Sequence, residues 1–206
     1  MNRRPERSEV CVTGTHDGFH IQFKHGIMFR RKEKEEDPIT SVKKRLQLDE
    51  ETLDKFDEVV EMCRAVYIGL GKGFAESVYE QAVCIELQQR AIQYVSQETL
   101  PCMYKDRFVG NIRLDIILHS WLPFIFELKA VGSAIQTEER WQLIRYMSRK
   151  NVPYGAVVNF NQSVTKGLDI SFIVCDEGKY YIYDIETCEG RLMKDARDST
   201  QLTNPG

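Results

Sequence analysis

The stretch RLDIILHSWLPFIFELKAV, residues 113–131, predicts two strongly apolar strands around a short turn. Successive side chains of a strand point to opposite faces of the sheet. The even-numbered positions of both strands are apolar, so we expect one face of this hairpin to be wholly hydrophobic. The opposite face would carry three charged side chains, Asp115, Glu127 and Lys129. These three residues are therefore the first candidates for a functional site.

The register of the hairpin decides which of these charges meet. A hairpin centred on Trp121 places Asp115 directly opposite Glu127, with their Cβ atoms ~5 Å apart. Two carboxylates at that distance repel each other, and a shared proton or a divalent cation would offset the repulsion. A centre one residue earlier pairs Glu127 with Arg113, and one residue later pairs Asp115 with Lys129. Those two pairs would be ordinary cross-strand ion pairs, and the sequence leaves all three registers open.

The composition predicts a soluble globular protein. The chain has 206 residues, of which 42% are hydrophobic and 29% are charged. It contains no apolar run of the ~20 residues that cross a bilayer, and its first residues are charged, so we expect neither a membrane span nor secretion. Six cysteines include no Cys-x-x-Cys pair, and several lie in apolar periodic segments. This predicts an intracellular, reducing compartment, the cytoplasm or nucleus, and disfavours a zinc site.

Charge separates an N-terminal extension from the rest of the chain. Residues 1–48 hold 11 Lys and Arg against 7 Asp and Glu, whereas residues 49–206 hold 17 against 24. We expect residues 1–48 to form a basic extension, with a small β-meander of three short apolar runs and a charged linker. A local electrostatic contact and a solvated tail both fit its charge. A homodimer or protein contact through this extension is one alternative.

The order of elements predicts an α/β domain over residues 49–186, followed by a polar tail over residues 187–206. Three strands in a meander, a helix and a further strand make a mixed central sheet flanked by helices. We expect helices at 49–68, 74–90 and 137–150, strands at 94–104, 108–118, 122–131 and 154–160, and a terminal hairpin at 171–185.

Three further polar residues lie on the predicted helices. Glu76 is in the first turn of the second helix, where complementing the helix dipole for ~0.3–1 kcal/mol is its ordinary role. Gln142 and Tyr146 are four residues apart and share one face of the third helix. An ordinary half-buried helix surface would explain that pair equally well.

An ordered set of short motifs brings these residues together. Residues 73–79, GFAESVY, fit G-x-x-E-x-x-Y, and Asp115 ends an R-x-D step. Residues 127–129 supply E-x-K, residues 142–146 supply Q-x-x-x-Y, and residues 159–160 read NF. Over residues 50–175 the chain resembles the GxxExxY proteins and the RecB-like branch of the PD-(D/E)XK nuclease superfamily. The resemblance implies a restriction-endonuclease-like αβββαβ core.

The resemblance also implies a metal-dependent active site. Glu76, Asp115 and Glu127, helped by the Leu128 carbonyl, would hold Mg²⁺ or Mn²⁺. Lys129 would orient the attacking water and neutralise charge on the scissile phosphate. Gln142 and Tyr146 would position a phosphate or a water molecule. The expected reaction is the hydrolysis of phosphodiester bonds, in DNA in preference to RNA.

A catalytically silent nucleic-acid-binding or scaffolding module that retains the nuclease fold is the alternative. The acidic body favours it, because a nuclease needs a basic track for the nucleic-acid backbone. No nucleophile elbow and no His-centred triad stand out in the sequence, which disfavours an unrelated hydrolase. Six cations near the expected site were candidates for such a track: Arg107, Arg113, Arg140, Arg145, Arg149 and Lys150.

Overall fold

The computed structural model describes residues 12–15, 18–21 and 39–194 of the chain, which divides into two units at residues 36 and 37. In the first unit, β1 (Val12–Thr15) and β2 (Gly18–Ile21) form an antiparallel pair in which Val12 faces Ile21. The third apolar run of the expected meander, at residues 27–29, and the expected linker lie outside the described residues. In the part of the chain that the structure describes, no helix is long and apolar enough to cross a membrane.

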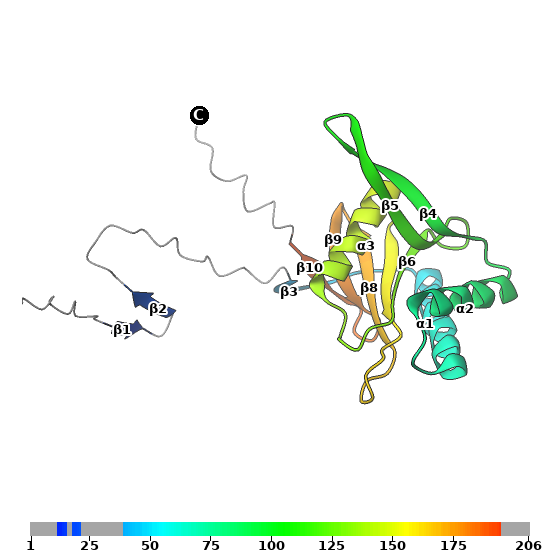
Figure 1. Cartoon of the computed structure of the whole chain (residues 1–206), viewed down its shortest axis with the longest axis horizontal. Coiled ribbons are helices and arrows are strands. Elements are labelled where there is room, and N and C mark those ends of the chain that lie inside the picture. Colours follow the sequence, from blue (N-terminus) through cyan, green and yellow to red (C-terminus); the bar gives the residue numbers. More distant parts are fainter. Residues whose placement is uncertain (1–11, 16–17, 22–38, 195–206) are drawn as a thin grey trace, which may run out of the picture. The chain divides into compact units, whose positions relative to one another are not determined.

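The second unit is built on a mixed eight-stranded sheet in the order β3-β10-β9-β8-β7-β6-β5-β4. Among the described strands of this sheet, only β6 and β7 pair in parallel, and α3 connects them. The expected α/β class and the αβββαβ order are confirmed (Figure 1). The elements are β3 (Ile39–Arg45), α1 (Glu50–Leu70), α2 (Glu76–Gln89), β4 (Tyr94–Tyr104), β5 (Arg107–Leu118), β6 (Phe124–Lys129), α3 (Thr137–Lys150), β7 (Tyr154–Asn159), β8 (Asp169–Asp176), β9 (Lys179–Asp184) and β10 (Glu189–Met193).

Local signals at the helix ends explain where α1 and α3 begin and stop. The Asp49 carboxylate accepts a hydrogen bond of 2.7 Å from the Thr52 backbone N–H, which caps α1. Gln136 and Glu139 form a reciprocal capping box at the start of α3. Asn151, in the left-handed conformation, ends α3. The lengths of these helices are therefore set by neighbouring residues.

Two apolar layers hold helices on both faces of the sheet. α1 and α2 cover one face, where the Phe56 ring stacks on Phe172 with centroids 4.6 Å apart. α3 covers the other face through Leu143 and Met147. Gly155 of β7 permits this close approach, because a Cβ there would meet the Leu143 and Met147 side chains of α3 at 3.0 and 3.2 Å. The two layers fix α2 and α3 on opposite sides of β6.

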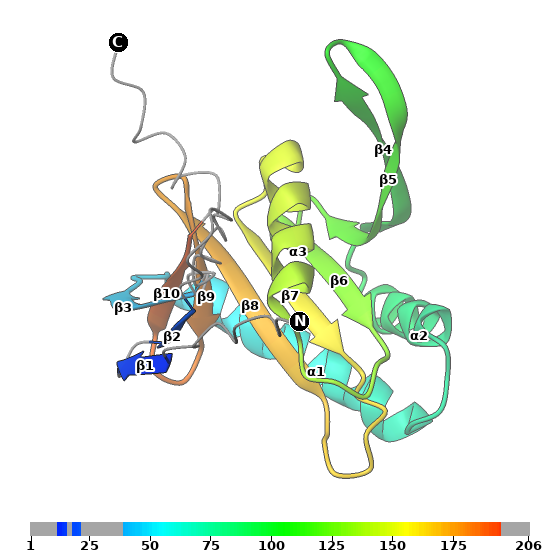
Figure 2. The same cartoon turned by 60° about the vertical axis from the view of Figure 1, so that its left-hand side comes forward.

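β4 and β5 form a ribbon that continues beyond the rest of the sheet (Figure 2). β5 pairs with β4 from Arg107 to Leu118, but it pairs with β6 only over Ile116–Leu118. No other described strand therefore pairs with the outer part of the ribbon. Its apolar side chains are 55–63% exposed, namely Met103, Tyr104, Phe108 and Val109.

Two strands lie beyond the domain boundaries that we expected at residues 49 and 186. β3 comes from the expected extension and pairs with β10, which comes from the expected polar tail. Lys43 of β3 forms an ion pair of 2.5 Å with Glu189 of β10. The two strands are 146 residues apart and rich in charged side chains, so neither has a local apolar pattern that would reveal it.

Candidate active site

The register of the β5–β6 hairpin is the one centred on Trp121. Ile116 pairs with Phe126 and Leu118 pairs with Phe124, so the next positions along the strands are Asp115 and Glu127. Neither of the alternative cross-strand ion pairs occurs among the described residues. Instead, Lys129 pairs with Glu127 of its own strand. The two acids therefore face each other where the β5–β6 ladder ends.

We expected one face of the hairpin to be wholly apolar, and the structure corrects this expectation. The side chains of β5 change from one face of the sheet to the other at Asp115. Ile116 packs in the layer with α1 and α2, whereas Leu114 packs in the layer with α3. Opposite this point, between the pairs Ser96–Ile116 and Glu98–Leu114, Gln97 has a left-handed φ of 57°. An irregularity of this kind bends a strand and re-aims a side chain. The side chains of β5 therefore change face between Leu114 and Ile116, and Asp115 lies at that point.

Glu127 is the most deeply buried acid of the site, with 1% of its surface exposed. One carboxylate oxygen accepts a hydrogen bond from Lys129, and the other has no hydrogen-bond partner among the described residues. Burial raises the pKa of Glu127 to about 7, and the nearby Asp115 carboxylate adds to the rise. Ionisation of the Glu127 carboxyl group is therefore unfavourable unless further positive charge lies close to it.

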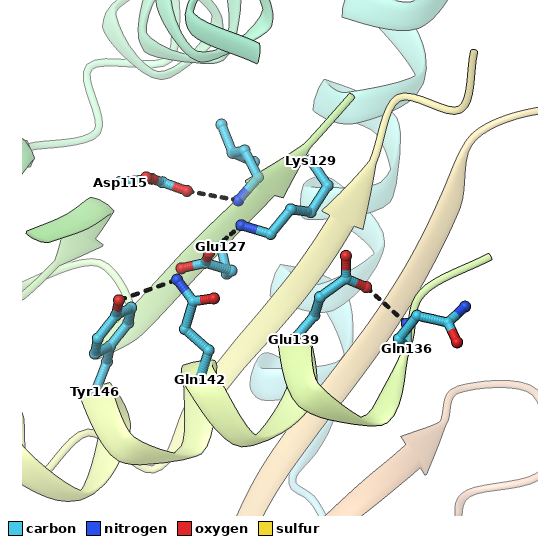
Figure 3. A network of polar contacts seen from close by, with 8 residues as sticks. Asp115, Glu127, Lys129, Gln136, Glu139, Gln142 and Tyr146 are labelled. Carbon is cyan, nitrogen blue, oxygen red and sulfur yellow. Dashed lines mark hydrogen bonds and ion pairs between the residues drawn. The ribbon is translucent and has the colours of Figure 1, made fainter. Parts of the chain in front are cut away.

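Asp115 is held by the backbone of the neighbouring strand. Its carboxylate accepts a hydrogen bond of 2.7 Å from the Leu128 N–H (Figure 3). Burial raises the pKa of Asp115, while this hydrogen bond and the charge of Lys129 act in the opposite direction. The hydrogen bond thus fixes the Asp115 carboxylate beside Glu127 and Lys129.

Glu76 is the first residue of α2 and reaches the same group of charges. Burial raises its pKa, Lys129 lowers it, and Asp115 raises it. For Lys129, burial alone would lower the pKa, but the hydrogen bond to Glu127 and the nearby acids raise it. Three carboxylates thus surround one ammonium group.

A clamp on the loop before α2 determines where Glu76 lies. The Tyr79 hydroxyl donates a hydrogen bond of 2.8 Å to the Gly71 carbonyl, and its ring stacks on Phe160 with centroids 4.6 Å apart. The Gly73 N–H donates to the Gln162 side chain at 2.5 Å. Gly73 has a φ of 98°, which a glycine adopts without strain. The fixed Gly and Tyr of G-x-x-E-x-x-Y therefore anchor both sides of Glu76.

Gln142 and Tyr146 face the acids from α3. The Gln142 side-chain amide donates a hydrogen bond of 3.0 Å to the Tyr146 hydroxyl, and Figure 3 shows Gln142 reaching toward Glu127. Burial raises the pKa of Tyr146, as do the charges of Glu127 and Asp115. All six side chains that we expected in the site, from Glu76 to Tyr146, therefore lie in one neighbourhood.

Three further polar residues support the site, and of these only Asn159 belongs to one of the motifs, the NF of residues 159–160. The Asn159 side-chain amide donates to the Ser133 carbonyl at 2.8 Å, and its oxygen accepts from the Val131 N–H. Asn161 also donates to the Ser133 carbonyl, and Gln162 holds the loop before α2. For Asn161 and Gln162, the only signal in the sequence is their place in a polar run directly after a buried strand.

The arrangement is acidic, buried and incompletely bonded. As the side chains stand, no group of three or more His, Cys, Asp or Glu among the described residues could hold a metal ion. One Glu127 oxygen nevertheless has no hydrogen-bond partner among the described residues, and burial raises the pKa values of all three acids, which outnumber the single Lys129 ammonium beside them. A cluster of this kind can take up protons or a hard cation.

Comparison with known proteins adds one match. Residues 54–170, more than half of the chain, match the family model described as PD-(D/E)XK nuclease superfamily. The matched segment contains every residue of the cluster described above. No curated protein and no solved structure matches the chain.

Proposed function

The chain belongs to the PD-(D/E)XK nuclease superfamily, and on that premise we propose that it hydrolyses phosphodiester bonds with the help of Mg²⁺ or Mn²⁺. The observation that carries this proposal is the buried Glu127 oxygen without a hydrogen-bond partner, beside two further acids. We propose DNA in preference to RNA as the substrate. The ordered motifs further support a place among the GxxExxY proteins.

The residues fit a hard divalent cation. Such cations take oxygen ligands and are commonly bound through one or two carboxylates, with water and phosphate completing the shell. Glu76, Asp115 and Glu127 would hold the ion. Their raised pKa values support this role, because bound cations offset the burial of carboxylates.

The backbone of Leu128 supports a fourth ligand. In a β-strand the N–H and C=O of one residue point to the same side. The Leu128 N–H points to Asp115, so its carbonyl is directed toward the same gap between β5 and β6. This direction supports the Leu128 carbonyl as a ligand beside Asp115.

Lys129 and the α3 pair would act on the reacting groups. Lys129 is charged and lies on the same face of β6 as Glu127, so it would neutralise phosphate charge and orient the attacking water. Gln142 and Tyr146 would position a phosphate or a water molecule through their amide and hydroxyl groups. When bound, the metal would polarise the phosphoryl group and lower the pKa of its bound water.

A cleavage assay tests this function. Wild type, Asp115→Asn and Lys129→Ala would be incubated with single-stranded, duplex and branched DNA and with RNA, in Mg²⁺ and in Mn²⁺. Asp106→Asn is the matched control, since Asp106 lies in the turn between β4 and β5, outside the site, and asparagine tolerates its left-handed φ of 60°. The proposal fails if the wild type cuts none of these substrates and calorimetry detects no binding of either metal.

A catalytically silent nucleic-acid-binding or scaffolding module is the second candidate. It is favoured by the absence, among the described residues, of a group of side chains already arranged to hold a metal. In that case Asp115→Asn would raise stability without changing metal affinity, and the wild type would bind nucleic acid without cutting it. Measuring metal binding and cleavage on the same preparations separates the two candidates.

A further inference from the structure

A groove between α3 and the strands β9 and β10 has a charge opposite to that of the active site. Its volume is about 590 Å³, and α3, β9 and β10 contribute its walls. Every charged side chain that lines it is basic. We call it the basic groove and define it by Trp141, Arg145, Arg149, Lys179, Tyr180 and Lys194.

Three of these cations are available to a ligand. Arg145, Arg149 and Lys179 are exposed, and none forms an ion pair with another described residue. Two other candidates for the basic track are engaged elsewhere. Lys150 pairs with Glu98, and Arg140 donates hydrogen bonds to Ser171 and to the Ile135 carbonyl. The free positive charge on α3 is therefore concentrated in the basic groove, although the whole chain has a net charge of -3.

Aromatic side chains accompany the cations. Trp141 and Tyr180 are half-buried and line the groove from α3 and β9 respectively. A basic channel with aromatic faces is the usual design for binding a single nucleic-acid strand, since phosphates meet the cations and unpaired bases stack on the rings. Bases inside a duplex are already stacked and would not reach these rings.

The basic groove is connected to the active site through α3. Gln142, Arg145 and Arg149 follow one another at spacings of three and four residues, so they form one stripe along the helix. A strand bound through Arg145 and Arg149 would therefore continue toward Gln142 and the acids beyond it.

We propose that the basic groove binds the backbone of a single-stranded nucleic acid, with bases stacked on Trp141 and Tyr180, and directs that strand to the active site. This inference rests on the proposed function for the direction of the strand. Binding itself is independent of cleavage and can be measured without metal.

The first test measures binding in EDTA, which prevents metal-dependent cleavage. Fluorescence anisotropy would follow a labelled 15-mer of thymidine, an RNA of the same length and a duplex. We expect Arg145→Glu combined with Arg149→Glu to weaken binding of the single strands at least tenfold. The dependence of log K on log salt should fall by ~1.4, for two lost phosphate contacts at ~0.7 each. Arg64→Glu, an exposed arginine of α1, is the control and should bind as the wild type does.

The second test uses the chain's two tryptophans. Trp121→Phe leaves Trp141 as the only tryptophan, and we expect its fluorescence to be quenched by the unlabelled thymidine 15-mer. The Arg145/Arg149 variant needs no tryptophan substitution, so the proposal stays testable if Trp121→Phe does not fold. Unchanged affinity of the Arg145/Arg149 variant for the single strands would overturn the proposal. Tighter binding of the duplex than of the single strands by the wild type, or equal binding of a polyglutamate peptide, would also overturn it.

The outcomes also separate this inference from the proposed function. If the basic groove binds single strands but the protein cleaves nothing in Mg²⁺ or Mn²⁺, the binding proposal holds and the proposed nuclease activity is contradicted. If the Arg145/Arg149 variant cleaves with the wild-type KM, the binding role of the basic groove is contradicted and the proposed nuclease activity holds. The RNA and DNA arms of the binding assay show which strand the basic groove favours.

Discussion

The active site and the basic groove lie on two sides of α3 and differ in their charges: the active site holds buried acids, and the basic groove holds exposed cations. Glu127 is 1% exposed, and its neighbours Asp115 and Glu76 have raised pKa values. Arg145 and Arg149 are exposed to solvent. Buried charges interact strongly because water does not screen them, whereas exposed charges are screened and cost little. The acids should therefore dominate chemistry and stability, and the cations should affect association.

The largest expected effect comes from removing a buried acid. If the proposed function holds, Asp115→Asn or Glu127→Gln should lower the cleavage rate about 10³-fold, because losing a proposed metal ligand would remove several kcal/mol of transition-state stabilisation. Neither change should weaken single-strand binding in EDTA. Single-turnover cleavage and anisotropy on the same preparations measure the two effects. Equal losses of cleavage and binding would show that the two regions are not separate.

The pH dependence of stability should come next in size. Burial raises the pKa of Glu127 from its ordinary value of 4.5 to about 7 in the folded chain, so the folded chain binds this proton more tightly. Its contribution is complete below pH 4.5 and is lost as the pH rises through 7. The free energy of unfolding should therefore drop by about 3 kcal/mol between these limits.

Urea denaturation in EDTA at pH 4.5 and pH 8 measures this drop. Glu127→Gln should reduce it, because glutamine does not titrate, although Glu76 and Asp115 act in the same direction. Glu61→Gln, an exposed acid of α1, should keep the wild-type slope. An identical pH dependence in wild type and Glu127→Gln would contradict the burial argument.

Moving α3 should affect both regions together. A Cβ at Gly155 would meet the Ile125 carbonyl at 2.9 Å and the Leu143 and Met147 side chains at 3.0 and 3.2 Å, so Gly155→Ala forces the helix outward. We expect a loss of about 1–3 kcal/mol in the free energy of unfolding. Cleavage and strand binding should both weaken.

Thermal and urea unfolding measure the loss for Gly155→Ala. Gly167→Ala is the matched control, because nothing lies within 4 Å of a Cβ at that position. A stable Gly155→Ala variant with normal cleavage would show that α3 adapts without moving the site.

The smallest expected effect concerns the clamp at Tyr79. Tyr79→Phe keeps the ring on Phe160 but removes the hydrogen bond to Gly71, which should cost about 1 kcal/mol of stability. Cleavage should fall about tenfold as Glu76 loosens, while strand binding in EDTA stays unchanged. Tyr104→Phe, at the exposed end of the ribbon, is the control. A drop in strand binding would contradict this prediction, because it would show that Tyr79 acts on the basic groove and not only on the active site.

Elements with local signals were predictable from the sequence. The bounds of β4 and α3 agree with the expected ranges, since turn residues and caps lie beside them. The E-x-K spacing was sufficient to place Glu127 and Lys129 on one face. The register was not predictable, because residues 119–123 allow three hairpin centres. The change of face at Asp115 lies opposite Gln97 on the neighbouring strand, and the pairing of β3 with β10 joins segments at the two ends of the domain, so neither has a local signal in the sequence.

The pairing of β3 with β10 has a topological consequence. Ile39 and Met193 face each other in the ladder, so the ends of the described sheet meet at one edge. β3 is five strands from β6, or about 24 Å along the sheet at ~4.8 Å per strand. A loop of about two to five residues, the usual hairpin length, would join these ends and close the chain into a ring. Reopening that ring at the Lys105–Asp106 turn would give a circular permutant with the same neighbours and a different start.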